Sequence, residues 1–156
     1  MEWLKDNFSI TTLKNRIDIE YVHRFLSQSY WAEGIPMETV RQSINGSLCF
    51  SLFYWGKQIG FARVITDEAT FAYLCDVFID EEWRGKGLSK WLMEVIINYP
   101  GLQGLRRFAL ITRDAHNLYS QFGFEPLNNA NKWMQVHKPG LYKAAAQTMD
   151  TENYTD

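Results

Sequence analysis

The sequence predicts a single mixed α/β domain, and three observations lead to that fold class. The chain has 156 residues, which suits one domain that buries most of its unfolded surface. β-Branched and aromatic residues fill several short stretches in its middle, whereas apolar residues recur at helical spacing from Leu88 onward. Strand-like and helix-like segments therefore alternate, which is typical of a central, twisted mixed sheet flanked by about four helices.

The elements are expected in the order strand, two helices, three strands, helix, strand, helix, strand. The strands are expected at 8–12, 48–54, 58–66, 69–79, 107–112 and 133–136, and the helices begin after Asp18, at Pro36, at Leu88 and after Asp114. The almost unbroken apolar run at 69–79 indicates a strand buried on both faces, near the middle of the sheet. We expect one domain over 1–142 and a mobile, polar tail over 143–156.

Composition and charge exclude several functions. The formal net charge is −2 and no basic stripe is present, which disfavours nucleic-acid binding. Two cysteines give no disulfide framework and suit a reducing compartment. No apolar stretch reaches the roughly 20 residues of a membrane span, and the N-terminus does not resemble a signal peptide. We expect a cytoplasmic protein that binds no membrane, nucleic acid or metal.

A glycine-rich junction links the apolar run at 69–79 to the helix from Leu88. Its residues are Arg84, Gly85, Lys86 and Gly87. Helix N-termini carry unpaired N–H groups and a partial positive charge, and glycine lets an anion approach the backbone. The junction predicts a phosphate site, although a tight turn beside a solvated basic face remains an equal alternative. It matches neither the P-loop pattern nor G-x-G-x-x-G.

Two segments together resemble the GNAT N-acetyltransferase superfamily. Residues 84–89, Arg-Gly-Lys-Gly-Leu-Ser, are similar to its R/Q-x-x-G-x-G/A motif, and 115–124 are similar to its A-x-x-L-Y-x-x-x-G-F segment. Ser89 departs from the usual Gly or Ala, and Thr112 stands where many members have Asn. The resemblance implies that acetyl-CoA, the acyl donor, is bound by Val77, Phe78, Ile79, Arg84, Gly85, Lys86, Gly87, Leu88, Ser89, Asn117 and Tyr119.

The resemblance also implies direct attack of a primary amine on the thioester, without an acyl-enzyme. It makes the backbone N–H of Val77 the oxyanion donor and Tyr119 the acid that protonates the leaving sulfur. Tyr119 has a packing alternative, because it shares a helical face with other apolar residues. Asp76 is the candidate base, since a lone carboxylate in an apolar strand needs a partner or a use. Hydrogen bonding to loops, or deprotonation through water, is the alternative. Cys75 is expected to be a small buried residue.

The acceptor is expected to be a small-molecule or peptide amine. Tyr30, Trp31 and Glu33 lie between the first two helices, which border the acceptor cleft in the family. Aromatic walls and a carboxylate suit a cationic amine, although a core aromatic pair beside a solvated glutamate is equally compatible. A second hypothesis is a non-catalytic acyl-CoA-binding module that senses the cofactor or mediates assembly. We expect a monomer or a homodimer.

Overall fold

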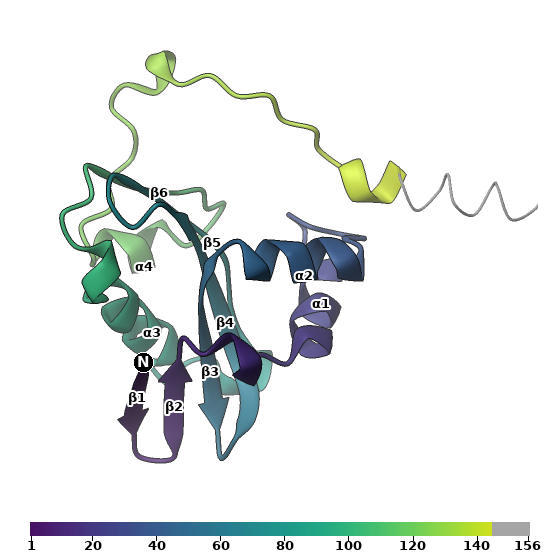
Figure 1. Cartoon of the computed structure of the whole chain (residues 1–156). Coiled ribbons are helices and arrows are strands. Elements are labelled where there is room, and N and C mark those ends of the chain that lie inside the picture. Colours follow the sequence, from purple (N-terminus) through teal and green to yellow (C-terminus); the bar gives the residue numbers. More distant parts are fainter. Residues whose placement is uncertain (145–156) are drawn as a thin grey trace, which may run out of the picture. The chain divides into compact units, whose positions relative to one another are not determined.

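The computed structural model describes residues 1–144, and it contains a six-stranded mixed sheet (Figure 1). The strands are β1 (Glu2–Lys5), β2 (Phe8–Thr11), β3 (Leu48–Tyr54), β4 (Lys57–Thr66), β5 (Phe71–Ile79) and β6 (Arg107–Leu110). The α-helices whose two ends lie within the described residues are α1 (Ile19–Ser27), α2 (Met37–Asn45), α3 (Leu88–Ile97) and α4 (His116–Ser120). The tail expected over 143–156 lies almost wholly outside the described residues.

The strands follow one another across the sheet in chain order, from β1 to β6. Pairing is antiparallel from β1 to β5 and parallel between β5 and β6. A parallel pair needs a crossover connection, and α3 supplies it. The mixed α/β fold class expected from the sequence is confirmed.

The chain divides into two compact units, each of which is described by itself. The first contains Met1–Asp18 and Ser43–Glu125, and therefore the whole sheet with α3 and α4. The second contains Ile19–Gln42 and the chain from Pro126 onward, and therefore α1 and most of α2. Among residues 1–144, no helix is long and apolar enough to cross a membrane.

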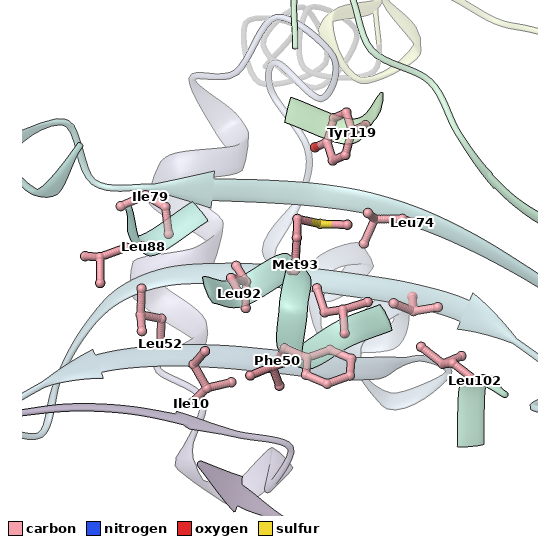
Figure 2. Close-up of a cluster of buried hydrophobic side chains, with 14 of the residues drawn as sticks. Ile10, Phe50, Leu52, Leu74, Ile79, Leu88, Leu92, Met93, Leu102 and Tyr119 are labelled. Atoms are coloured by element: carbon pink, nitrogen blue, oxygen red, sulfur yellow. The ribbon is translucent and has the colours of Figure 1, made fainter. Parts of the chain in front are cut away.

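The core of the first unit lies between α3 and one face of the sheet (Figure 2). Leu88, Leu92 and Ile96 repeat at helical spacing and are buried along one side of α3. They contact the sheet side chains that include the fully buried Phe50 and Leu52 of β3. The packing holds the start of α3 against the end of β5, where the candidate site lies.

Four details differ from the expectations. β1 was not expected, and it forms an antiparallel hairpin with β2. No strand forms at 133–136, where Met134 and Val136 are 94% and 92% exposed and have no ladder to complete. β5 is fifth of six strands, so its expected place near the middle of the sheet is wrong. Before α4, Thr112 rather than Asp114 accepts a backbone hydrogen bond, from the N–H of Ala115 at 3.0 Å.

Candidate functional site

A glycine-bearing turn precedes α3 and leaves the start of that helix open. Gly85 and Gly87 have positive φ, 75° and 74°, and Gly87 directly precedes the helix. No side chain hydrogen-bonds to the helix start from that position, so its first N–H groups can serve an external acceptor. A Cβ added at either glycine would meet no atom within 4 Å, so the space over the turn is open. The turn fits a phosphate or pyrophosphate group.

Basic side chains surround this turn. The Nε of Arg84 donates a 3.1 Å hydrogen bond to the carbonyl oxygen of Ile79, the last residue of β5. The Nζ of Lys86 lies 4.5 Å from the ring centroid of Trp83, in a cation–π contact. Lys90 is exposed near the start of α3. The turn thus concentrates positive charge in a chain whose formal net charge is −2.

β5 contains a β-bulge shortly before its end. The pairing of β4 with β5 shifts register between Phe61 and Arg63, so Asp76 and Val77 lie opposite Ala62 alone. Asp76 has a φ of 52°, in the left-handed region that glycine usually occupies. A bulge takes backbone groups out of the regular ladder and changes the direction of the strand. The strand is therefore bulged at the residue expected to supply the oxyanion donor, Val77.

The bulge also decides which face of the sheet each side chain reaches. In a regular strand, residues an odd number apart point to opposite faces. Leu74 and Ile79 are an odd number apart, yet both are buried in the cluster against α3. Phe78 does not belong to that cluster, and its ring lies 6.1 Å from the ring of its cross-strand partner Phe61. The change of register therefore lets apolar side chains of β5 pack on both faces of the sheet.

The pairing of β5 with β6 ends before the bulge. The two strands pair in parallel up to Leu74 and Leu110, where β6 ends. β5 continues to Ile79, so β6 offers no pairing to its second half. Backbone N–H and C=O groups along the edge of a strand can bind an extended ligand in the manner of an added strand.

Helix α4 places Tyr119 in the core and Asn117 on the surface. Tyr119 is 9% exposed, and its ring centroid lies 6.0 Å from that of Phe124. Figure 2 shows Tyr119 beyond Met93, on the far side of the cluster from Phe50. Asn117 is exposed. Since the ring of Tyr119 packs in the core, a chemical role would fall to its hydroxyl group.

Asp76 has an arginine partner that the sequence reasoning missed. Its Oδ2 lies 2.7 Å from the Nε of Arg63, and the side chains of Asp76 and Arg63 are 9% and 15% exposed. Burial disfavours the charge of Arg63, but nearby groups, Asp76 first among them, outweigh burial and raise its pKa. A lone arginine within the apolar stretch 58–66 was the available signal.

Both cysteines lie near this ion pair. Cys49 and Cys75 are the cross-strand partners of Arg63 on its two sides. Burial raises the pKa of each thiol to about 12. The thiolate is the nucleophilic form, so neither cysteine suits covalent catalysis near neutral pH.

The residues expected to receive the acceptor surround one pocket in the second unit. Tyr30, Trp31 and Glu33 line a cavity of about 290 Å³ together with residues 137–143, which were not expected there. The rings of Tyr30 and Trp31 meet edge to face, with centroids 5.0 Å apart. Glu33 Oε2 lies 2.7 Å from the Nζ of Lys143, and both side chains are about half exposed. The pocket carboxylate therefore already binds a primary ammonium group, which belongs to this chain.

Comparison with known proteins shows one family. The family model described as the acetyltransferase (GNAT) domain matches residues 45–126. A solved structure from Xanthomonas campestris pv. campestris, provisionally named a GNAT-family acetyltransferase, is 49% identical, with a TM-score of 0.85 over 86% of this chain and 96% of that chain. A protein of Gibberella zeae, provisionally named an acetyltransferase, is 27% identical over an alignment of 143 positions that covers 76% of this chain and 79% of that protein.

A more distant structure shows the same fold and contains the acyl donor. It is an acetyltransferase, assigned by prediction, from Clostridium acetobutylicum, and it was solved with acetyl-CoA. It is 13% identical, with a TM-score of 0.61 over 88% of this chain and 96% of that chain. At this identity the likeness concerns the fold alone.

Proposed function

The chain belongs to the GNAT acetyltransferase family, and on this premise we propose that it transfers acetyl from acetyl-CoA to a primary amine by direct attack in a ternary complex. The amine belongs to a small molecule or a peptide. One observation carries the proposal: a bulge at Val77, a strand segment that runs beyond β6 to Ile79, and a glycine turn at Gly85 and Gly87 follow one another along the chain. They suit the thioester, the pantetheine arm and the pyrophosphate, in that order.

The bulged strand orients the reacting end of the donor. The Val77 N–H donates to the thioester carbonyl oxygen, where negative charge grows during attack. A backbone donor held by the sheet needs little rearrangement, which is the advantage of such a site over water. The backbone groups of Phe78 and Ile79 pair with the amides of the pantetheine arm, along the part of β5 that extends beyond β6.

The turn and the start of α3 hold the pyrophosphate. Backbone N–H groups from Gly85 to Ser89 donate to the phosphate oxygens, and positive φ at the glycines keeps side chains away from them. Arg84 and Lys86 add positive charge beside the turn, while the buried Leu88 anchors the helix start to the core. Acetyl-CoA supplies the acetyl group as an activated thioester.

Two protons must move during the transfer. Tyr119 donates its hydroxyl proton to the departing sulfur, because a phenol with a pKa near 10 is protonated at neutral pH. The exposed Asn117, on the same helix, contributes a polar contact to the donor. The cationic acceptor loses one proton to water before it attacks, and its nitrogen loses a second proton to water or to a carboxylate as the amide forms; Asp76 is the carboxylate next to Val77 in β5.

The acceptor pocket selects for positive charge. Tyr30 and Trp31 provide aromatic walls, and Glu33 provides a carboxylate. The 2.7 Å ion pair between Glu33 and the primary ammonium group of Lys143 supports this proposal. We therefore expect an alkyl amine that is cationic in solution.

An amine panel with acetyl-CoA tests the proposal. Release of free coenzyme A thiol is followed with a thiol reagent, and the same protein without amine gives the background. We expect release with one or more alkyl amines and a mass increase of one acetyl group on that amine. Tight acetyl-CoA binding without transfer to any amine would contradict the proposal and favour a non-catalytic acyl-CoA-binding module.

A further inference from the structure

A buried ion pair lies directly at the bulge of β5, and the chemistry proposed above makes no use of its arginine. Arg63 donates a 2.7 Å hydrogen bond from Nε to Oδ2 of Asp76. The two side chains are 15% and 9% exposed, so both charges are largely removed from water. Burying a charged pair costs free energy, and leaving one partner alone is strongly destabilising. Its location beside Val77 indicates a role in the site.

The backbone of Asp76 needs support from its side chain. Its φ of 52° is unfavourable for residues other than glycine, although aspartate and asparagine tolerate it best. A bulge with a left-handed first residue normally has glycine there. Asp76 instead provides a carboxylate that the neighbouring strand holds through Arg63. The ion pair thus stabilises a conformation that the backbone alone disfavours.

Arg63 is itself held from a second side. Its Nη1 donates a 3.0 Å hydrogen bond to Oγ of Ser47, and that hydroxyl donates at 2.7 Å to the carbonyl oxygen of Ser43 in α2. The backbone N–H of Ser47 also bonds to the last turn of α2, at the carbonyl oxygen of Ile44. The guanidinium is therefore fixed between α2 and β5, and it fixes the carboxylate in turn.

Three other titratable groups near the pair, Cys49, Cys75 and Tyr73, are neutral at pH 7. Cys49 on β3 and Cys75 on β5 are cross-strand partners of Arg63, and burial raises the pKa of both to about 12. Burial also raises the pKa of Tyr73 on β5. Lys14 acts electrostatically on Cys49. Arginine keeps its charge throughout the working pH range, so the cation of the pair persists there.

We propose that Arg63 and Asp76 are positioning residues whose ion pair fixes the bulge that presents the Val77 N–H to the thioester. Asp76 is then not the base, and the amine loses its proton to water. The inference rests on the proposed acetyl transfer and names the residues that set its geometry. The Asp76 side chain is 9% exposed, and its Oδ2 accepts the Nε hydrogen bond of Arg63, so this oxygen is directed at the guanidinium group rather than at an amine.

Matched variants separate positioning from proton transfer. Arg63→Gln and Asp76→Asn each remove one charge, their double variant removes both, and Arg63→Lys keeps the cation. We expect each single variant to lower kcat about 10²-fold, the size of losing one oxyanion donor, with little change in the Kd for acetyl-CoA. The double variant is no slower than the slower single variant, because the two residues act as a unit. Arg63→Lys recovers part of the rate, and the exposed Arg106→Gln serves as the control.

The pH–rate profile provides the decisive comparison for the base. If the pair only positions the bulge, the pH–rate profile of each slow variant keeps the shape of the wild-type profile. The inference is overturned if Asp76→Asn removes the acidic limb while Arg63→Gln retains the wild-type rate and profile. Wild-type kcat in both single variants would also overturn it, because the bulge would then form without the pair.

The amide resonance of Val77 gives a measurement that needs no acceptor. Acetyl-CoA should shift this resonance in wild-type protein, and the shift should be lost in Arg63→Gln and Asp76→Asn alike. An unchanged Val77 response in both variants would overturn the inference even if no amine were turned over. A wild-type protein that binds acetyl-CoA and transfers to no amine would contradict only the proposed function. If the single variants unfold, the rate, the pH–rate profile and the Val77 amide response are measured on Arg63→Lys and on the double variant. Neither of these leaves one charge of the pair unpaired.

Discussion

At the scale of single residues, Tyr119 joins a packing role to a proposed chemical role. Its ring is buried against Phe124, whereas acid catalysis would use only the hydroxyl group. The two roles are separable, because phenylalanine keeps the ring and loses the proton.

Tyr119→Phe should lower turnover while leaving the fold intact. General acid catalysis is typically worth 10²–10⁴-fold, so we expect kcat to fall at least about tenfold on a productive amine. The melting temperature and the acetyl-CoA affinity should stay close to wild type, since the aromatic contacts remain. Steady-state kinetics and thermal melts check this. Full turnover would assign the proton to water or another group, and a much lower melting temperature would favour the packing role.

The two thiols should react slowly in the native protein. Burial raises the pKa of Cys49 and Cys75 to about 12 from 9.0, so only about 10⁻⁴ of each is thiolate at pH 8. Their reaction with a thiol reagent should be far slower than in denatured protein and should accelerate as pH rises toward 12. A rapid reaction of native protein with the thiol reagent at pH 8, before any amine is added, would contradict the raised pKa values.

Sequence reasoning located the turn residues but not Arg63. The turn is local, because its glycines and basic residues are adjacent in the chain. The partners Arg63 and Asp76 are 13 residues apart, and the register shift between β4 and β5 lies in their part of the ladder. Register depends on tertiary packing, so no spacing in the sequence reveals this ion pair.

At the scale of elements, β5 shows how a correct pattern led to a wrong position. The apolar run predicted burial on both faces, and Leu74, Phe78 and Ile79 are indeed buried. Because of its bulge, β5 buries these residues although it lies next to the edge strand, whereas the prediction assumed a central strand. Residues 133–136 have strand-like composition but no ladder partner in the described chain, and composition alone could not decide this.

The segment 137–143 should compete weakly with a cationic acceptor. Lys143→Met removes the ammonium from Glu33, so the KM for an alkyl amine should fall, at most about fivefold, because exposed ion pairs are worth up to about 1 kcal/mol. Lys138→Met, at another lysine of the same pocket, is the matched control. A KM that is unchanged or higher in Lys143→Met would show that Glu33 does not bind the acceptor.

At the scale of the whole molecule, the donor features and the acceptor pocket belong to different units. The bulge, the part of β5 beyond β6 and the turn lie within Ser43–Glu125, whereas the pocket residues lie within Ile19–Gln42 and the chain after Pro126. Sequence patterns predicted the fold class, and the family resemblance supplied the candidate residues of both sets, apart from the contribution of 137–143. Donor binding can therefore be tested without knowledge of the acceptor.

Ser89 is a suitable position for that test. It lies in the first turn of α3 and is half-buried. Gly87 is less suitable, because its φ of 74° would strain any replacement. A glutamate at Ser89 should stabilise the helix start by about 0.3–1 kcal/mol through the helix dipole. The same negative charge should repel a pyrophosphate bound there.

Calorimetric titration of acetyl-CoA into Ser89→Glu and Ser89→Gln tests the central claim most directly. Glutamine matches the shape of glutamate without its charge, so the comparison isolates electrostatics. We predict an affinity at least about tenfold lower in Ser89→Glu than in Ser89→Gln, with an equal or higher melting temperature. Equal affinities in the two folded variants would contradict the claim that the pyrophosphate of acetyl-CoA binds at the start of α3.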